Sequence, residues 1–127
     1  MFKSPLVLQA LDAPGEWVLT RPLLWEGKRK IEVPAGFVTD LASIPAPLRG
    51  LLNVNGKSRR AAVLHDWLYC SQLGTRAEAD ATLREALQAE GVTIACWVYW
   101  LGVRIGGWRY YGHRKDGLKG SDFTRRR

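Results

Sequence analysis

The order in which hydrophobic patterns occur along the chain limits its fold more than any other feature. Residues 6–38 contain short aliphatic and aromatic runs interrupted by Pro and Gly, which is typical of strands and turns. From residue 58 onward, apolar side chains instead recur at helical spacing. Strands that precede helices indicate an α+β fold. We therefore predict a short-stranded β part, then an antiparallel helix hairpin, then a third helical segment rich in Trp and Gly.

Five runs in the first part have the composition of short strands. They are residues 6–11, 17–20, 23–25, 30–33 and 37–38.

The helix hairpin is marked by its caps and stops. Ser58 is a suitable N-cap for a first helix that continues to about residue 73, where Gly74 ends it. Thr75 and Glu78 have the spacing of a capping box, and the second helix that they begin ends at Gly91. Because the connection between the two helices is so short, they must pack antiparallel.

A third apolar segment spans residues 92–108 and carries four aromatic side chains. Gly102 and Gly106 lie one helical turn apart within it, which favours a helix that another backbone can approach closely. Since β-branched and aromatic residues dominate its first half, a strand is an open alternative there.

Length and charge indicate one α+β domain over residues 1–111 and a basic tail over residues 112–127. The 127 residues suffice for one core, and the formal net charge is +7. From Arg104 onward there are eight Lys or Arg and two Asp, so nearly all of the excess lies at this end. Such a tail could contact nucleic acid phosphates or anionic lipid headgroups, or it could be a solubilising end.

Cysteine content and hydropathy bear on the compartment. The chain has two cysteines, so it lacks a disulfide framework, and synthesis in a reducing cytoplasm is the simpler interpretation. Its first apolar run is a poor signal sequence. Residues 92–103 form the longest apolar stretch, which is shorter than the roughly 20 residues that span a bilayer.

The candidate functional residues lie on the hairpin. His65 and Tyr69 are four residues apart and share the buried face of the first helix. Asp80 occupies a position in the apolar stripe of the second helix, together with Leu83 and Leu87. Because a buried carboxylate requires hydrogen-bond partners, we expect Asp80 to contact Tyr69 and, one turn further along, His65.

This arrangement predicts a specific chemistry. If Asp80 holds one imidazole nitrogen of His65, the other nitrogen can take a proton from water, which makes His65 a general base. Asp66 lies about 100° around the helix axis, at the edge of the packed face, where a hard cation such as Ca²⁺ could reach it. Together these groups suffice for ester hydrolysis without a covalent intermediate. The alternative is a purely structural network of the same residues.

A second candidate region is the loop at residues 33–45, which Gly and Pro bound. Asp40 could complete a cation site, and Ser43 is a weaker candidate for a nucleophile. Alternatively, Thr39, Asp40 and Ser43 only cap a turn or a short helix.

The sequence over about residues 30–110 resembles an uncharacterised family of tailed phages and prophages, domain of unknown function 1353. The resemblance lies in residues 33–45, in residues 61–69 with His65-Asp66 and Tyr69, in Ala79-Asp80, and in the Trp/Gly-rich residues 97–108. It implies a phage or prophage protein made in the host cytoplasm, and it fits a virion component.

A shorter resemblance concerns the chemistry. The pattern His65-Asp66-x-x-Tyr69, followed by Ala79-Asp80, is similar to the active-site helix pair of secreted phospholipases and of parvovirus capsid phospholipase domains. It implies that His65 activates water, that Asp66 binds calcium, and that Tyr69 and Asp80 orient His65. The glycine-rich calcium loop of those enzymes has no match in this sequence, so residues 36–40 would have to replace it.

Three functions follow as hypotheses. The first is a metal-assisted ester hydrolase that meets a phospholipid surface through its Trp residues and basic tail. The second is a non-enzymatic tail or virion protein that contacts other phage proteins. The third, nucleic-acid binding, has only the charge of the tail to support it. A solvent-connected cleft at His65, Asp66 and Asp80 would favour the first hypothesis, and a sealed arrangement the second.

Overall fold

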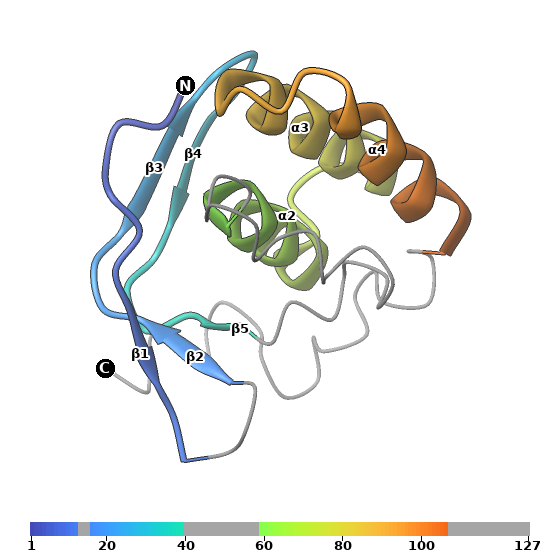
Figure 1. The fold of residues 1–127 in the computed structure, drawn as a ribbon. Coiled ribbons are helices and arrows are strands. Elements are labelled where there is room, and N and C mark those ends of the chain that lie inside the picture. Colours follow the sequence, from blue (N-terminus) through green and yellow to red (C-terminus); the bar gives the residue numbers. More distant parts are fainter. Residues whose placement is uncertain (13–15, 40–58, 107–127) are drawn as a thin grey trace.

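The computed structural model describes residues 1–12, 16–39 and 59–106 (Figure 1). An N-terminal part made of antiparallel strands precedes three helices, so the predicted α+β class is confirmed. The elements, in chain order, are β1 (Leu8–Ala10), β2 (Trp17–Leu19), β3 (Leu23–Glu26), β4 (Lys30–Val33), β5 (Val38–Thr39), α2 (Arg59–Ser71), α3 (Arg76–Ala89) and α4 (Ala95–Gly106).

The strands form two small antiparallel units. Each of the five predicted runs overlaps one of the five observed strands. β1, β2 and β5 form a three-stranded sheet in that order, while β3 and β4 form a hairpin. Leu23 pairs with Val33 and Trp25 pairs with Ile31, and all four side chains face the core. The alternating residues Leu24 and Glu32 face outward. This period of two is why the hairpin covers the core with one face only.

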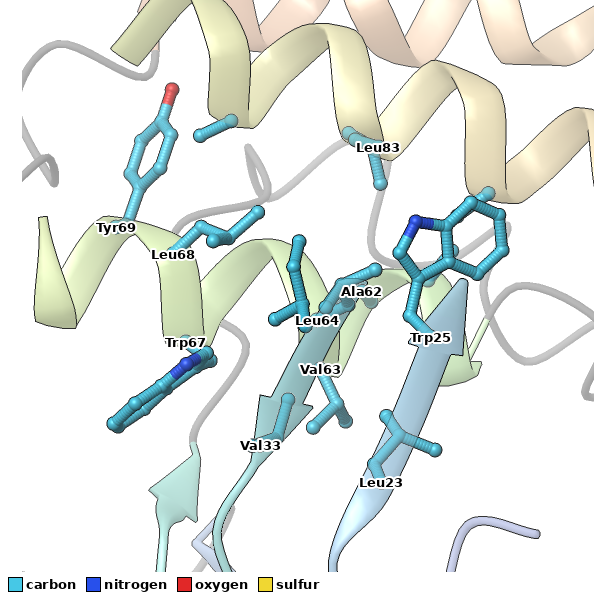
Figure 2. Close-up of a cluster of buried hydrophobic side chains, with 14 of the residues drawn as sticks. Leu23, Trp25, Val33, Ala62, Val63, Leu64, Trp67, Leu68, Tyr69 and Leu83 are labelled. Atoms are coloured by element: carbon cyan, nitrogen blue, oxygen red, sulfur yellow. The ribbon is translucent and has the colours of Figure 1, made fainter. Parts of the chain in front are cut away.

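Helix α2 lies at the centre of the fold. In Figure 1 it runs between the strands on one side and the pair α3 and α4 on the other. All ten residues from 61 to 70 are buried, as expected for a helix covered on every side. Figure 2 shows Trp67 and Val63 directed toward the strands, and Tyr69 directed toward α3.

Local signals set the ends of the hairpin as predicted. Gly74 and Gly91 both have a φ of 89°, a conformation that suits glycine after a helix. The hydroxyl of Thr75 accepts from the backbone N–H of Glu78, and the Glu78 side chain accepts from the N–H of Thr75, which completes the capping box. The predicted N-cap, Ser58, lies outside the described residues.

The antiparallel packing of α2 and α3 is confirmed by a contact between opposite ends of the two helices. Arg60, at the start of α2, donates from Nε and Nη2 to the carboxylate of Glu90, at the end of α3, over 2.5 and 2.8 Å. This bidentate pair closes the end of the hairpin that lies away from the short connection.

The third segment is a helix from Ala95 onward, so the strand alternative for that part is wrong. Cys96, Tyr99 and Val103 recur at helical spacing and are buried in the core shared with α3. This packing outweighs the β propensity of the aromatic and branched side chains. None of the helices in the described part of the chain is long and apolar enough to cross a membrane.

Candidate functional site

Asp80 is the centre of a buried polar cluster between α2 and α3. Its Oδ1 atom lies 2.8 Å from Nε2 of His65 and accepts a hydrogen bond of 2.6 Å from the hydroxyl of Tyr69. The expected contacts of Asp80 with both α2 residues are therefore confirmed. They form because the i, i+4 spacing stacks His65 and Tyr69 on the side of α2 that faces α3.

Two arginines complete the cluster on the other carboxylate oxygen. Arg104, near the end of α4, donates from Nη1 to Oδ2 of Asp80 over 3.0 Å. Arg76, one turn before Asp80 on α3, places Nη1 3.7 Å from the same oxygen. Asp80 thus connects all three helices.

Neither arginine was predicted from the sequence. The i, i+4 spacing of Arg76 and Asp80 was a signal for the first. No local pattern links Asp80 to Arg104, which is 24 positions away.

The electrostatics of the cluster follow from burial and from these donors. The side chains of Asp80 and His65 are both 0% exposed. A carboxylate in such a place is stable only if its lone pairs are satisfied, and two cations and two further polar groups surround this one. Burial, reinforced by the hydrogen bond to Asp80, raises the pKa of the Tyr69 hydroxyl. Tyr69 therefore stays protonated and remains a donor at neutral pH.

The contact with Asp80 also selects a tautomer of His65. An ionised carboxylate requires a proton on Nε2, so in the neutral ring the basic lone pair is on Nδ1. The ring also contacts Tyr69, with 4.1 Å between the two ring centroids. Both contacts fix the orientation of the imidazole on α2.

Asp66 is placed differently from the prediction. We expected it at the edge of the packed face, but its exposed fraction is only 1%, and its Oδ2 accepts a 2.5 Å hydrogen bond from the hydroxyl of buried Thr39. The reason is that β5 packs against the side of α2 that carries Asp66, a side that helical geometry alone predicted to be accessible. Asp66 thus faces β5, whereas His65 faces α3.

Asp66 and Thr39 place two oxygen donors side by side in the core. The carboxylate of Asp66 and the hydroxyl of Thr39 are hard oxygen donors of the kind that Ca²⁺ prefers, so their chemistry fits this cation. The described ranges contain no group of three His, Cys, Asp or Glu side chains suited to a metal. Asp40, the other predicted ligand, and Ser43 lie outside those ranges, so calcium binding stays a prediction.

Burial distinguishes this site from an open cleft. His65 and Asp80 have no exposed side-chain surface, and Asp66 has almost none. Such complete burial of these side chains is what the structural hypothesis predicts.

Comparison with known proteins identifies the family. A family model described as "Protein of unknown function (DUF1353)" matches residues 17–103, which run from β2 almost to the end of α4. This chain belongs to the DUF1353 family. The match includes His65, Asp66, Tyr69 and Asp80, and it ends one residue before Arg104. No curated protein and no solved structure matches the chain.

Proposed function

We propose that this DUF1353 protein is a metal-assisted hydrolase of carboxylic esters, with phospholipids as the substrate class and His65 as the general base. One observation carries the proposal. Oδ1 of Asp80 accepts hydrogen bonds from both Nε2 of His65 and the hydroxyl of Tyr69. These bonds hold the imidazole of His65 in place and put its basic lone pair on Nδ1. The similarity of the His65-Asp66-x-x-Tyr69 pattern to phospholipase helix pairs supports the same chemistry.

The residues would act in two steps. Nδ1 of His65 takes a proton from a water molecule as its oxygen forms a bond to the ester carbonyl carbon, and Asp80 stabilises the imidazolium that results. When the tetrahedral intermediate collapses, the bond from carbon to the alkoxide oxygen breaks, and Nδ1 returns the proton to that alkoxide. Asp66 and Asp40 would hold a hard cation such as Ca²⁺, which would supply positive charge for the oxyanion.

The 0% exposure of the His65 side chain matches the sealed arrangement that favours the structural function, so catalysis requires an opening that admits one water molecule and one ester carbonyl to Nδ1. A general base acts on one water molecule, and exclusion of bulk water strengthens each electrostatic interaction within the site.

The burial and the arginine contacts also favour a second candidate function. Asp80 joins α2, α3 and α4 through His65, Tyr69 and Arg104, as expected of a purely structural polar network. In this alternative the protein is a non-enzymatic tail or virion component that binds other phage proteins. The resemblance to a family of tailed phages and prophages supports a phage origin, synthesis in the host cytoplasm and virion association under either function.

The test measures fatty acid release from mixed phospholipid vesicles, with Ca²⁺ and with a chelator. We expect calcium-dependent release by the wild-type chain and a loss of about 100-fold or more in His65→Gln. Gln keeps a donor for Asp80 but provides no base, so the thermal midpoint should change little. His113→Gln is the matched control, since His113 is the only other histidine in the sequence. It should keep full activity.

Two outcomes would overturn the hydrolase proposal. One is an absence of calcium-dependent release by the wild-type chain, and the other is equal release by the His65→Gln variant. A wild-type chain without activity, combined with a large drop in thermal midpoint for His65→Ala, would support the structural function instead.

A further inference from the structure

The outer face of α4 carries a continuous row of exposed apolar side chains. We name this row the α4 stripe, and each of its members is between 51% and 82% exposed. It consists of Ile94, directly before the helix, and of Trp97, Val98, Leu101 and Ile105.

The spacing of the stripe shows that it forms one surface. At about 100° per residue, its members fall within a single arc of the helix. Cys96, Tyr99 and Val103, which face the core, lie on the opposite side. Half of the large exposed hydrophobic side chains in the described part of the protein belong to this single stretch. Large apolar patches of this kind on a folded chain mark binding surfaces.

A cationic side chain borders the stripe. The guanidinium of Arg84, on α3, lies 4.5 Å from the ring centroid of Trp97 and 5.6 Å from that of Trp100. Within the described ranges Arg84 forms no ion pair with a carboxylate, and α4 itself contains no acidic residue. The sequence that follows α4 is strongly basic.

We infer that the α4 stripe docks on the surface of an anionic phospholipid bilayer, with α4 in the plane of the interface. Tryptophan and aliphatic side chains enter the boundary between headgroups and acyl chains, while arginine meets the phosphates. At 12 residues, α4 is too short to span a bilayer, so it lies along the surface. This inference goes beyond the proposed hydrolase and does not depend on catalysis.

Charge favours a lipid surface over a second copy of the chain. In a two-fold dimer, the same patch would face itself, so Arg84 would be brought toward its own counterpart. A chain with a net charge of +7 is instead complementary to a negative surface.

The test is cosedimentation of the full chain with vesicles of phosphatidylcholine alone or mixed with phosphatidylglycerol, in the presence of a chelator. We expect binding to the mixed vesicles and about tenfold weaker binding by a variant with Leu101→Gln and Ile105→Gln. The matched control carries Leu24→Gln and Leu73→Gln, which change exposed leucines outside α4. It should bind like the wild type, and both variants should unfold at the wild-type temperature.

Three results would overturn the inference. The first is equal binding by the stripe variant and the wild type, which would assign binding to the basic tail alone. The second is an absence of binding by the wild type. The third is a wild-type dimer in sedimentation velocity that the stripe variant converts to a monomer without any change in vesicle binding. Because the chelator suppresses calcium-dependent turnover, none of these results depends on the hydrolase proposal.

Discussion

The Asp80 cluster and the α4 stripe depart from ordinary patterning in opposite ways. The cluster places a carboxylate, an imidazole and a phenol in the core, whereas the stripe places Trp and aliphatic side chains on the surface. In the cluster, the chain itself satisfies the buried carboxylate, since Asp80 on α3 has partners on both α2 and α4. At the stripe, α4 is apolar on its outer face as well as on its inner face, so a partner outside the chain is needed to cover these side chains. We therefore expect changes in the Asp80 cluster to alter the stability of the fold, and changes in the α4 stripe to alter its association with a partner.

The largest effect on stability is expected from removing the centre of the cluster. Asp80→Ala leaves the His65 ring and the Tyr69 hydroxyl without their shared acceptor, and Arg104 without its carboxylate. Breaking a buried ionic network in this way costs about 3–5 kcal/mol of unfolding free energy. Urea denaturation measures this loss, with Asp12→Ala as an exposed control that should change it by less than about 0.5 kcal/mol. A small loss for Asp80→Ala would show that the cluster does not hold the helices together.

A smaller effect is expected from Tyr69→Phe, which removes one hydrogen bond to a charged acceptor. The expected loss at pH 7 is about 1.5–3 kcal/mol by the same measurement. A loss near zero would mean that His65 and the arginines satisfy Asp80 without Tyr69.

The Tyr69→Phe variant also tests the hydrogen bond between Tyr69 and Asp80 through its dependence on pH. Burial and the hydrogen bond to Asp80 raise the pKa of Tyr69 in the folded chain above its ordinary value of about 10. The unfolded chain therefore releases this proton first, so the stabilisation is complete below about pH 10 and is lost as the pH rises toward the folded value. We expect the unfolding free energy of the wild type to fall more steeply above pH 10 than that of Tyr69→Phe. Parallel curves would contradict the assigned hydrogen bond.

The smallest effect on stability is expected at the stripe. Ile105→Gln changes a side chain that is 69% exposed, so the unfolding free energy should stay within about 0.5 kcal/mol of the wild type. Thermal and urea unfolding both test this. Val103→Gln, two residues away on the buried face, is the matched comparison and should lose several times more. Equal losses for the two variants would mean that the outer face of α4 also packs within the protein.

Much of the fold was predictable because its signals are local. The capping box of Thr75 and Glu78 and the stops at Gly74 and Gly91 involve neighbouring residues only. The contacts of Asp80 with His65 and Tyr69 were predictable for a related reason. A short connection fixes the antiparallel packing of two helices, and the i, i+4 spacing then aligns the side chains.

The errors all concern positions that depend on distant elements. A strand alternative at the start of α4 followed from β propensity, which takes no account of packing against α3. Asp66 was placed at an exposed edge because helical geometry alone does not reveal that β5 covers it.

Local signals in the sequence specify the order of strands and helices, the ends of the hairpin and the pairing of an aspartate with a histidine and a tyrosine. These features depend on the period of the helix and on turns of a few residues, which local physics specifies. Tertiary packing, in contrast, brings Arg104 to Asp80 and Thr39 to Asp66, and it leaves one apolar face of α4 exposed. Those outcomes depend on how whole elements pack against one another, and no spacing along the chain encodes the distance between side chains on separate elements.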